Sequence, residues 1–140
     1  MNRSMIRHGF VLMLLALVGG FFVPAMEIPR LAVSAHTIGV LSGVLLIAVG
    51  AIWSQFTLGP RQAGVMYWGW LYAGYANWLG CLLGAATGAG RMTPVAAAGL
   101  EGTPVAETMV AFLLISVGVV SLVAAGLSLW GLRGNTLSAT

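Results

Sequence analysis

Two polar side chains lie inside apolar stretches of this sequence, and they are its first candidates for chemistry. His36 belongs to residues 31–53, a stretch that carries no formal charge and is long enough to cross a bilayer as a helix. Asn77 belongs to a second such stretch, residues 64–87. An ionisable group at membrane depth is costly, so it usually faces other helices or a cavity and marks a functional site.

Glycines line the helical face that His36 shares. At 100° per residue, Gly39, Gly43 and Gly50 all fall within about 60° of His36. So smooth a face accepts either a closely packed neighbouring helix or a flat ligand lying against bare backbone. In the first case His36 donates one hydrogen bond to the neighbour. In the second case His36 binds a cofactor that Gly39 and Gly43 flank.

Asn77 lies on a similar face of the second stretch. Trp70, Cys81 and Gly84 fall within about 40° of it, so this helix also presents one polar group on a stripe of mostly small residues. Packing alone predicts an interhelical hydrogen bond from Asn77, worth about 1 kcal/mol or less. Packing also predicts that Cys81 is a small buried residue, since an apolar setting disfavours its thiolate.

The rest of the composition excludes several enzyme classes. The chain has no aspartate for a Ser-His-Asp set, no acid at membrane depth for a carboxylate pair, and no lysine for a phosphate-binding loop. One neutral imidazole on an apolar face remains, and imidazole is a good ligand for the iron of haem, a flat and largely apolar disc. We expect the other histidine, His8, at the membrane interface. A haem would then have one axial histidine and an open iron face for Lewis-acid or oxygen chemistry.

The elements that position these residues must be membrane helices. Of 140 residues, 59% are hydrophobic and only 6% are charged, whereas a soluble domain has about 25% charged residues. The charges are six arginines and three glutamates with no basic run, so nucleic-acid binding has no support. A single cysteine excludes an internal disulfide. The sequence therefore predicts an all-α integral membrane protein.

The apolar stretches predict one domain over residues 1–140, a bundle of four transmembrane helices. We expect these helices at about 10–26, 31–53, 64–87 and 107–132. A basic start followed by an apolar stretch is also typical of a signal peptide. Glycines and Pro24 interrupt a clean cleavage site, however, so we expect a retained first helix.

Four spans place both termini and the second connection on one side of the membrane. That side holds Arg3, Arg7, Arg61 and Arg133, whereas the other holds Arg30, Arg91 and all three glutamates. By the positive-inside rule, both termini lie in the cytoplasm. Glycine faces on two helices are more than one small bundle needs, but they do not set an oligomeric state.

Several strings of the sequence resemble a known family. IPRLAVSAH with GVLSGVLLIAVGAIW, and then GYANWLGCLLGAATGAGRMTPVAAAG, resemble the bacterial hydroxylaminobenzene mutases, which are small four-helix membrane proteins. The resemblance runs from the first helix to Trp130, and YANW followed by GAGRMTP is its most specific part, since membrane insertion does not demand it. More distantly, the AH pair and the helix-three asparagine resemble styrene oxide isomerase, a trimeric enzyme of the membrane that holds haem b between subunits.

The resemblance implies roles for individual residues. His36 matches the haem-ligating histidine of the isomerase, and Asn77 matches the asparagine of its helix-three motif. Where the isomerase has a further asparagine, an aspartate and a tyrosine, this chain has Ser42, Ala73 and Cys81. These departures count against epoxide isomerisation and favour the mutase, whereas haem is implied only by the more distant relative.

The implied reaction is an isomerisation without net redox in a bacterial inner membrane, as part of aromatic degradation. Hydroxylaminobenzene would bind with its N–O oxygen near a haem iron or Asn77, and the oxygen would move to the ring ortho position to give 2-aminophenol. Trp70 and Trp78 would stack on the substrate ring, and Ser42 and Cys81 would line its pocket. The resemblance also implies a homotrimer.

Arg91, in the RMTP string, has two interpretations. It would orient a polar substrate or a haem propionate, or it is an interfacial charge that sets topology. For the whole chain, two alternatives to the mutase stay open: a non-catalytic membrane subunit or small-molecule carrier, in which His36 and Asn77 only pack, and an epoxide isomerase.

Overall fold

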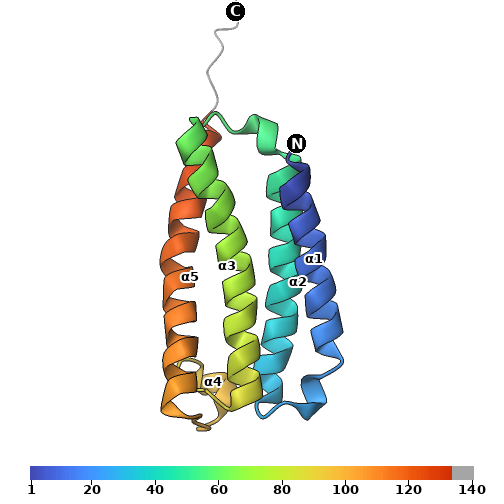
Figure 1. Ribbon diagram of the computed structural model, residues 1–140, viewed down its shortest axis with the longest axis vertical. Helices are drawn as coiled ribbons and strands as arrows, with labels where there is room; N and C mark the ends of the chain where they lie inside the picture. The colour runs from blue at the N-terminus through green and yellow to red at the C-terminus, as the bar shows by residue number, and fades with distance from the viewer. Residues whose placement is uncertain (134–140) are drawn as a thin grey trace, which may run out of the picture.

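The computed structural model describes residues 1–133 and consists of helices and their connections, with no strand in that range (Figure 1). Four long helices run side by side: α1 (Arg3–Gly20), α2 (Pro29–Ala51), α3 (Pro60–Thr87) and α5 (Pro104–Gly131). Short helical segments occupy the connections, namely η1 (Val23–Ala25), η2 (Trp53–Gln55) and α4 (Pro94–Ala97). The all-α class predicted from the sequence is confirmed.

Local signals set where the long helices begin and end. Pro29, Pro60 and Pro104 occupy first turns, where the missing N–H of proline costs nothing. The first helix begins at Arg3 instead of the expected residue 10, because the Asn2 side chain accepts a hydrogen bond from the Met5 N–H and caps it. It ends at Gly20 instead of residue 26, just before the turn that contains Pro24.

Among the described residues, three helices are long and apolar enough to cross a membrane: α1, α2 and α5. α3 has 28 residues, which is sufficient length. It is not one of the three, because its first half carries Arg61, Gln62 and several tyrosines and tryptophans of low hydropathy. Large apolar side chains are exposed along the outer faces, such as Phe112 and Leu122 on α5, as suits a lipid environment.

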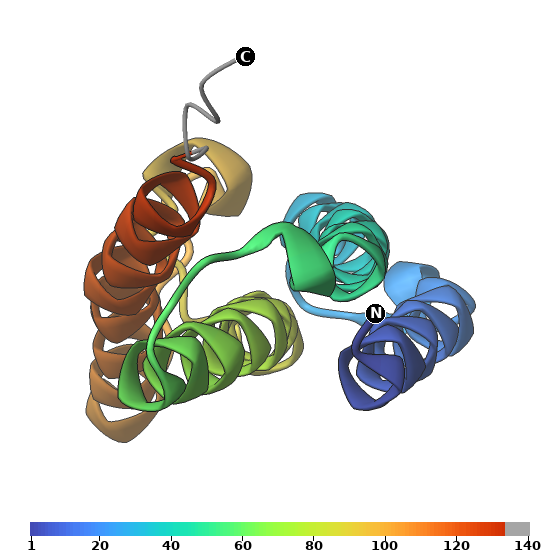
Figure 2. The ribbon, with the colours of Figure 1, turned by 90° about the horizontal axis from the view of Figure 1, so that it is seen from above.

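Seen from above, the helices follow one another in a winding row rather than a closed square (Figure 2). α1 packs on α2, α2 on α3, and α3 on α5. Two buried clusters hold this row together. One contains Met5, Leu12, Leu46, Val49 and Leu71, and the other contains Ile28, Leu31, Ala32, Ala35, Cys81, Ala85 and Ala97. α2 and α5 both pack on α3, and a small cavity lies between the three helices.

The glycine face of α2 is covered by α1. A methyl group on Gly43 would lie 2.7 Å from the Gly9 carbonyl oxygen, and one on Gly39 would meet Ala16 and the Trp78 ring. Of the two alternatives for this face, the structure therefore realises the close neighbouring helix. Gly39 and Gly43 have no open surface between α1 and α2 on which a planar cofactor could lie, so their expected contact with one is not supported by the packing.

Candidate functional site

His36 lies on α2 beside the end of α1, and it is half-buried. Its Nδ1 atom is 2.9 Å from the carbonyl oxygen of Ala16 in α1. A carbonyl only accepts hydrogen bonds, so Nδ1 carries the proton and donates it, which leaves the lone pair on Nε2. The hydrogen bond to a neighbouring helix that packing predicted is thus present, and it leaves the second ring nitrogen available.

A groove of about 800 Å³ opens beside this imidazole. Its other walls are apolar, and His36 contributes the one polar side chain among the described residues that line it. The lining also includes Leu17, Gly20, Phe21, Val23, Pro24 and Val33. A neutral histidine whose Nδ1–H is fixed by a backbone carbonyl is the usual form of a metal-binding histidine. The groove therefore fits a largely apolar group that needs one nitrogen ligand.

No cluster of three or more metal-ligating side chains occurs in residues 1–133. A bare metal ion usually needs several protein ligands. A haem supplies four nitrogens of its own and needs only an axial ligand. The donor set of His36 alone matches that requirement.

Asn77 lines a different and smaller cavity, of about 160 Å³, between α2, α3 and α5. Ser42 enters this cavity from α2, Trp70 from α3, and Ser121 from α5. The Trp70 indole N–H donates to the Ser128 hydroxyl at 3.0 Å, which fixes its ring. Three predicted site residues, Ser42, Trp70 and Asn77, are therefore brought together. Their cavity is small and carries hydrogen-bonding groups among apolar side chains.

The amide of Asn77 is available to a ligand. Within the described part of the chain, its side chain makes no hydrogen bond, so the interhelical bond expected from packing is not formed. Ser121, by contrast, donates to the Gly118 carbonyl of its own helix at 3.1 Å. The cavity thus offers one amide with both donor and acceptor atoms, beside an apolar wall of Leu46 and Val117.

His36 and Asn77 do not share a cavity within one chain. Ser42 follows His36 by six positions, or about 240° around α2 at 100° per residue, so the two side chains leave the helix on different sides. The other predicted site residues lie elsewhere. Trp78 packs against Gly39, and Cys81 is buried in the cluster around Ala35 and Ala85, as the packing interpretation of Cys81 expected.

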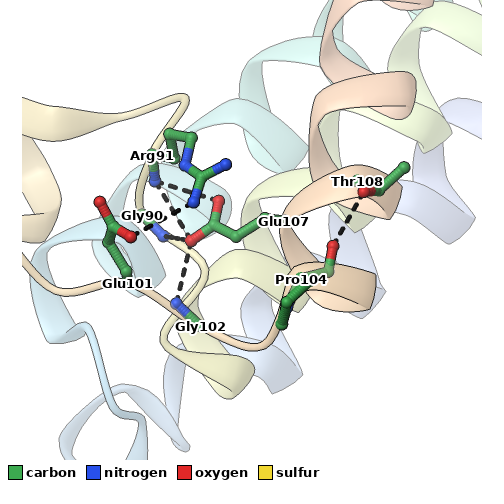
Figure 3. A network of polar contacts seen from close by, with 7 residues as sticks. All are labelled: Gly90, Arg91, Glu101, Gly102, Pro104, Glu107 and Thr108. Atoms are coloured by element: carbon green, nitrogen blue, oxygen red, sulfur yellow. Dashed lines mark hydrogen bonds and ion pairs between the residues drawn. The ribbon is translucent and has the colours of Figure 1, made fainter.

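Arg91 lies on the connection between α3 and α5, and Glu107 organises this loop (Figure 3). The Glu107 carboxylate is only 4% exposed and accepts hydrogen bonds from the backbone N–H groups of Gly90 at 3.0 Å, Arg91 at 3.2 Å and Gly102 at 2.9 Å. The Arg91 guanidinium pairs with Glu101 at 3.3 Å, and both side chains are exposed. Arg91 does not line the His36 groove, so this geometry fits its interpretation as an interfacial charge.

The similarity of the whole chain to known proteins identifies its class. A family profile described as styrene oxide isomerase matches residues 1–133. The chain belongs to this family. Hydroxylaminobenzene mutase HabB of Ectopseudomonas oleovorans is 44% identical over 132 residues, which cover 94% of this chain and 80% of the relative. Hydroxylaminobenzene mutase HabA of the same organism is 40% identical over 117 residues, covering 83% and 87%. No solved structure matches.

This chain is therefore an enzyme, an isomerase, and the resemblance read from YANW and GAGRMTP is confirmed. The alternative of a non-catalytic subunit or carrier is set aside by this membership. The match extends through α1, α2 and α3 and along α5, so it includes both the His36 groove and the Asn77 cavity.

Two contacts of this isomerase were missed by the sequence analysis. The Nδ1 atom of His8 lies 3.3 Å from the Tyr75 hydroxyl, which also donates to the His8 carbonyl oxygen at 3.2 Å. The second is the set of backbone hydrogen bonds by which Glu107 holds the loop. Neither contact has a local signal, since His8 and Tyr75 are 67 positions apart and Glu107 bonds residues that only the folded loop brings near.

Proposed function

We propose that this isomerase converts hydroxylaminobenzene-type arylhydroxylamines into 2-aminophenols without net redox. The observation that carries the proposal is the 44% identity to HabB over 94% of the chain. In this reaction the N–O bond breaks, a C–O bond forms at the ring ortho carbon, and the proton lost from that carbon is balanced by one gained at nitrogen. Substrate and product are isomers, so no external oxidant or reductant is needed.

We further propose that the His36 groove would hold haem b, with the Nε2 atom of His36 as the protein's ligand to it. Support comes from the lone pair on Nε2, the Ala16 carbonyl that holds Nδ1–H, and the apolar walls of the groove. When bound, haem would supply a Lewis acid for the substrate N–O oxygen. The chain's own residues would bind the ring in apolar surroundings and exclude water, which favours transfer of the oxygen within the molecule over its loss to solvent.

Asn77 is the residue we assign to the polar end of the substrate. Its amide N–H donates to the N–O oxygen and stabilises negative charge that develops there as the bond breaks. Trp70, held by Ser128, provides a flat wall against the aromatic ring, and Ser42 offers a second hydroxyl. Ala73 lines the same cavity where the epoxide isomerase has an aspartate, so this chain is better suited to the mutase reaction.

The active enzyme is proposed to be a homotrimer in the bacterial inner membrane, with α3 as a fourth span and both termini in the cytoplasm. The arginine distribution supports this orientation, with four of six at the end where α1 and α3 begin. The His36 groove and the Asn77 cavity open on different sides of α2, so a neighbouring subunit is one way to bring both to one substrate.

One experiment tests the mutase reaction and the haem separately. Protein purified in detergent is given hydroxylaminobenzene without oxygen or reductant, and the aminophenols are separated by chromatography, with styrene oxide as the competing substrate. We expect 2-aminophenol, no uptake of heavy oxygen from labelled water, and little aldehyde from styrene oxide. If the preparation is active but shows no Soret band, the haem proposal is refuted and the mutase proposal stands. If it is active only on styrene oxide, the mutase proposal is refuted.

His36→Ala tests the haem proposal directly. We expect the variant to lose both the Soret band and the activity, while circular dichroism shows its helices intact. His36→Ala with unchanged 2-aminophenol production would remove His36 and the haem from the reaction.

A further inference from the structure

A second large groove, between α1 and α3, lies apart from His36 and Asn77. Both helices pack on α2 and touch each other only slightly, which leaves an open space of about 720 Å³. Arg7 and His8 face it from α1, and Trp68 and Tyr72 face it from α3. Val11 and Leu71 complete it with apolar surface. The surface of the groove is therefore mostly apolar, with one formal charge.

Most polar groups in this groove already have partners. The Ser4 hydroxyl lies 2.9 Å from the Tyr67 hydroxyl, the Tyr72 hydroxyl 2.6 Å from that of Ser116, and His8 bonds to Tyr75. Arg7 differs, because its guanidinium has no ion pair or hydrogen bond within residues 1–133. Five N–H donors and a permanent charge are thus available there.

Arg7 lies well inside the end of the helical row. Ser4 contacts Tyr67 and His8 contacts Tyr75, so Arg7 stands at a level between these two tyrosines of α3. Tyr67 is already about 10 Å along α3 from Pro60, at 1.5 Å per residue. A charge at this depth is costly unless it pairs with an anion or reaches upward to a headgroup.

No carboxylate side chain of this protein reaches that end. Glu27 and Glu101 belong to connections at the opposite end, and Glu107 belongs to the first turn of α5, which begins at that end together with α2 (Figure 1). A second copy in the same membrane orientation carries its glutamates at that opposite end too. The anion that balances Arg7 must therefore come from elsewhere than a glutamate of this enzyme.

We propose that this groove binds an anionic phospholipid, with the lipid phosphate at Arg7 and an acyl chain along Val11 and Leu71. A cation at one end of an apolar groove is complementary to an amphiphile that carries its anion at one end. The exposed Trp68 ring, 69% accessible, forms the wall between this groove and a neighbouring one that holds Arg61. The inference rests on the proposed membrane location and not on the proposed reaction.

Thermal unfolding in detergent tests the proposal, because a ligand that binds only the folded state raises the unfolding midpoint. The enzyme is heated with added phosphatidylglycerol, phosphatidylcholine, inorganic phosphate or benzoate. We expect phosphatidylglycerol alone to raise the midpoint. Arg7→Gln loses most of that shift, and Arg7→Lys keeps part of it. Arg3→Gln removes an equal charge from the same end of the molecule, at the exposed start of α1 and outside the lining of this groove, so it keeps the shift.

Three results would overturn the proposal: equal loss of the shift in Arg7→Gln and Arg3→Gln, an equal shift with phosphatidylcholine, or an equal shift with phosphate or benzoate. The first would indicate surface charge in general, the second a purely apolar lipid contact, and the third a small-anion site. Arg7→Gln is expected to turn over hydroxylaminobenzene normally in lipid-free detergent. A failure of the lipid test is therefore distinguishable from a failure of the proposed reaction.

Discussion

The Nδ1 atom of His36 lies 2.9 Å from the carbonyl oxygen of Ala16, so α1 determines which nitrogen of the imidazole is available to a ligand. One turn further along α1, Gly20 leaves the space that the ring occupies, since a methyl group there would lie 2.8 Å from the same Nδ1 atom. α1 thus supplies both the hydrogen-bond acceptor and the room. The orientation of His36 depends on a helix that contributes no side chain chemistry to it.

Gly20→Ala should therefore impair the site although His36 itself is not substituted. The added methyl group displaces the imidazole, and a displacement of about 1 Å at a reacting group costs about 10²-fold in rate. We expect 2-aminophenol production to fall by about that factor and the Soret band to weaken. Gly19→Ala is the matched control, because a methyl group there meets nothing within 4 Å, and it should leave both unchanged. Equal activity in the two variants would show that the imidazole is not held in place by α1.

Asn77→Leu should lower kcat/KM for hydroxylaminobenzene by about 10- to 100-fold, since a hydrogen bond to developing charge is worth about 1.5–3 kcal/mol. Leucine is close to asparagine in size, so the cavity stays filled. Ser121→Ala is the control in the same cavity, because its hydroxyl bonds the Gly118 carbonyl of its own helix, and it should retain activity. An Asn77→Leu enzyme with normal kinetics would remove Asn77 from the reaction.

Sequence reasoning found what depends on hydropathy and helical period. The four long helices, the glycine face of α2 and the burial of Cys81 all follow from the spacing of residues along single helices. Spacing also isolated His36 and Asn77. Helical spacing fixes the angle of each side chain around its own helix, and this angle places both residues on faces of mostly small residues.

What spacing could not give is which helices face each other. The meeting of Ser42 with Asn77 and Ser121 depends on how α2 and α5 lean on α3, and the separation of His36 from Asn77 depends on the same arrangement. The role of Glu107 depends on a loop that folds back by 17 positions to Gly90. Such contacts are set by tertiary packing, and the spacing of residues along one helix does not show which helices pack together.

Glu107→Ala should lower the unfolding midpoint markedly, because three backbone N–H groups of the loop lose their acceptor (Figure 3). Glu101→Gln is the matched control. It breaks an ion pair whose two side chains are 63% and 65% exposed, and such surface pairs contribute about 0–1 kcal/mol. Midpoints measured by circular dichroism in detergent should fall much further for Glu107→Ala. Equal midpoints for the two variants would mean that the loop is held mainly by α4 packing through Ala97.

Gly43→Ala tests the close approach of α1 and α2. The added methyl group would lie 2.7 Å from the Gly9 carbonyl oxygen and 3.1 Å from the Met13 Cβ, so the helices must separate, and overpacking of this kind costs about 1–3 kcal/mol. Gly118→Ala on α5 is the opposite case. Nothing lies within 4 Å of its added methyl group, and replacing a helical glycine by alanine stabilises by about 0.5–1 kcal/mol. Thermal unfolding should show a lower midpoint for the first variant and an equal or higher one for the second. A Gly43→Ala enzyme as stable as the parent would contradict the contact between the two backbones, because only an open face tolerates the methyl group without cost.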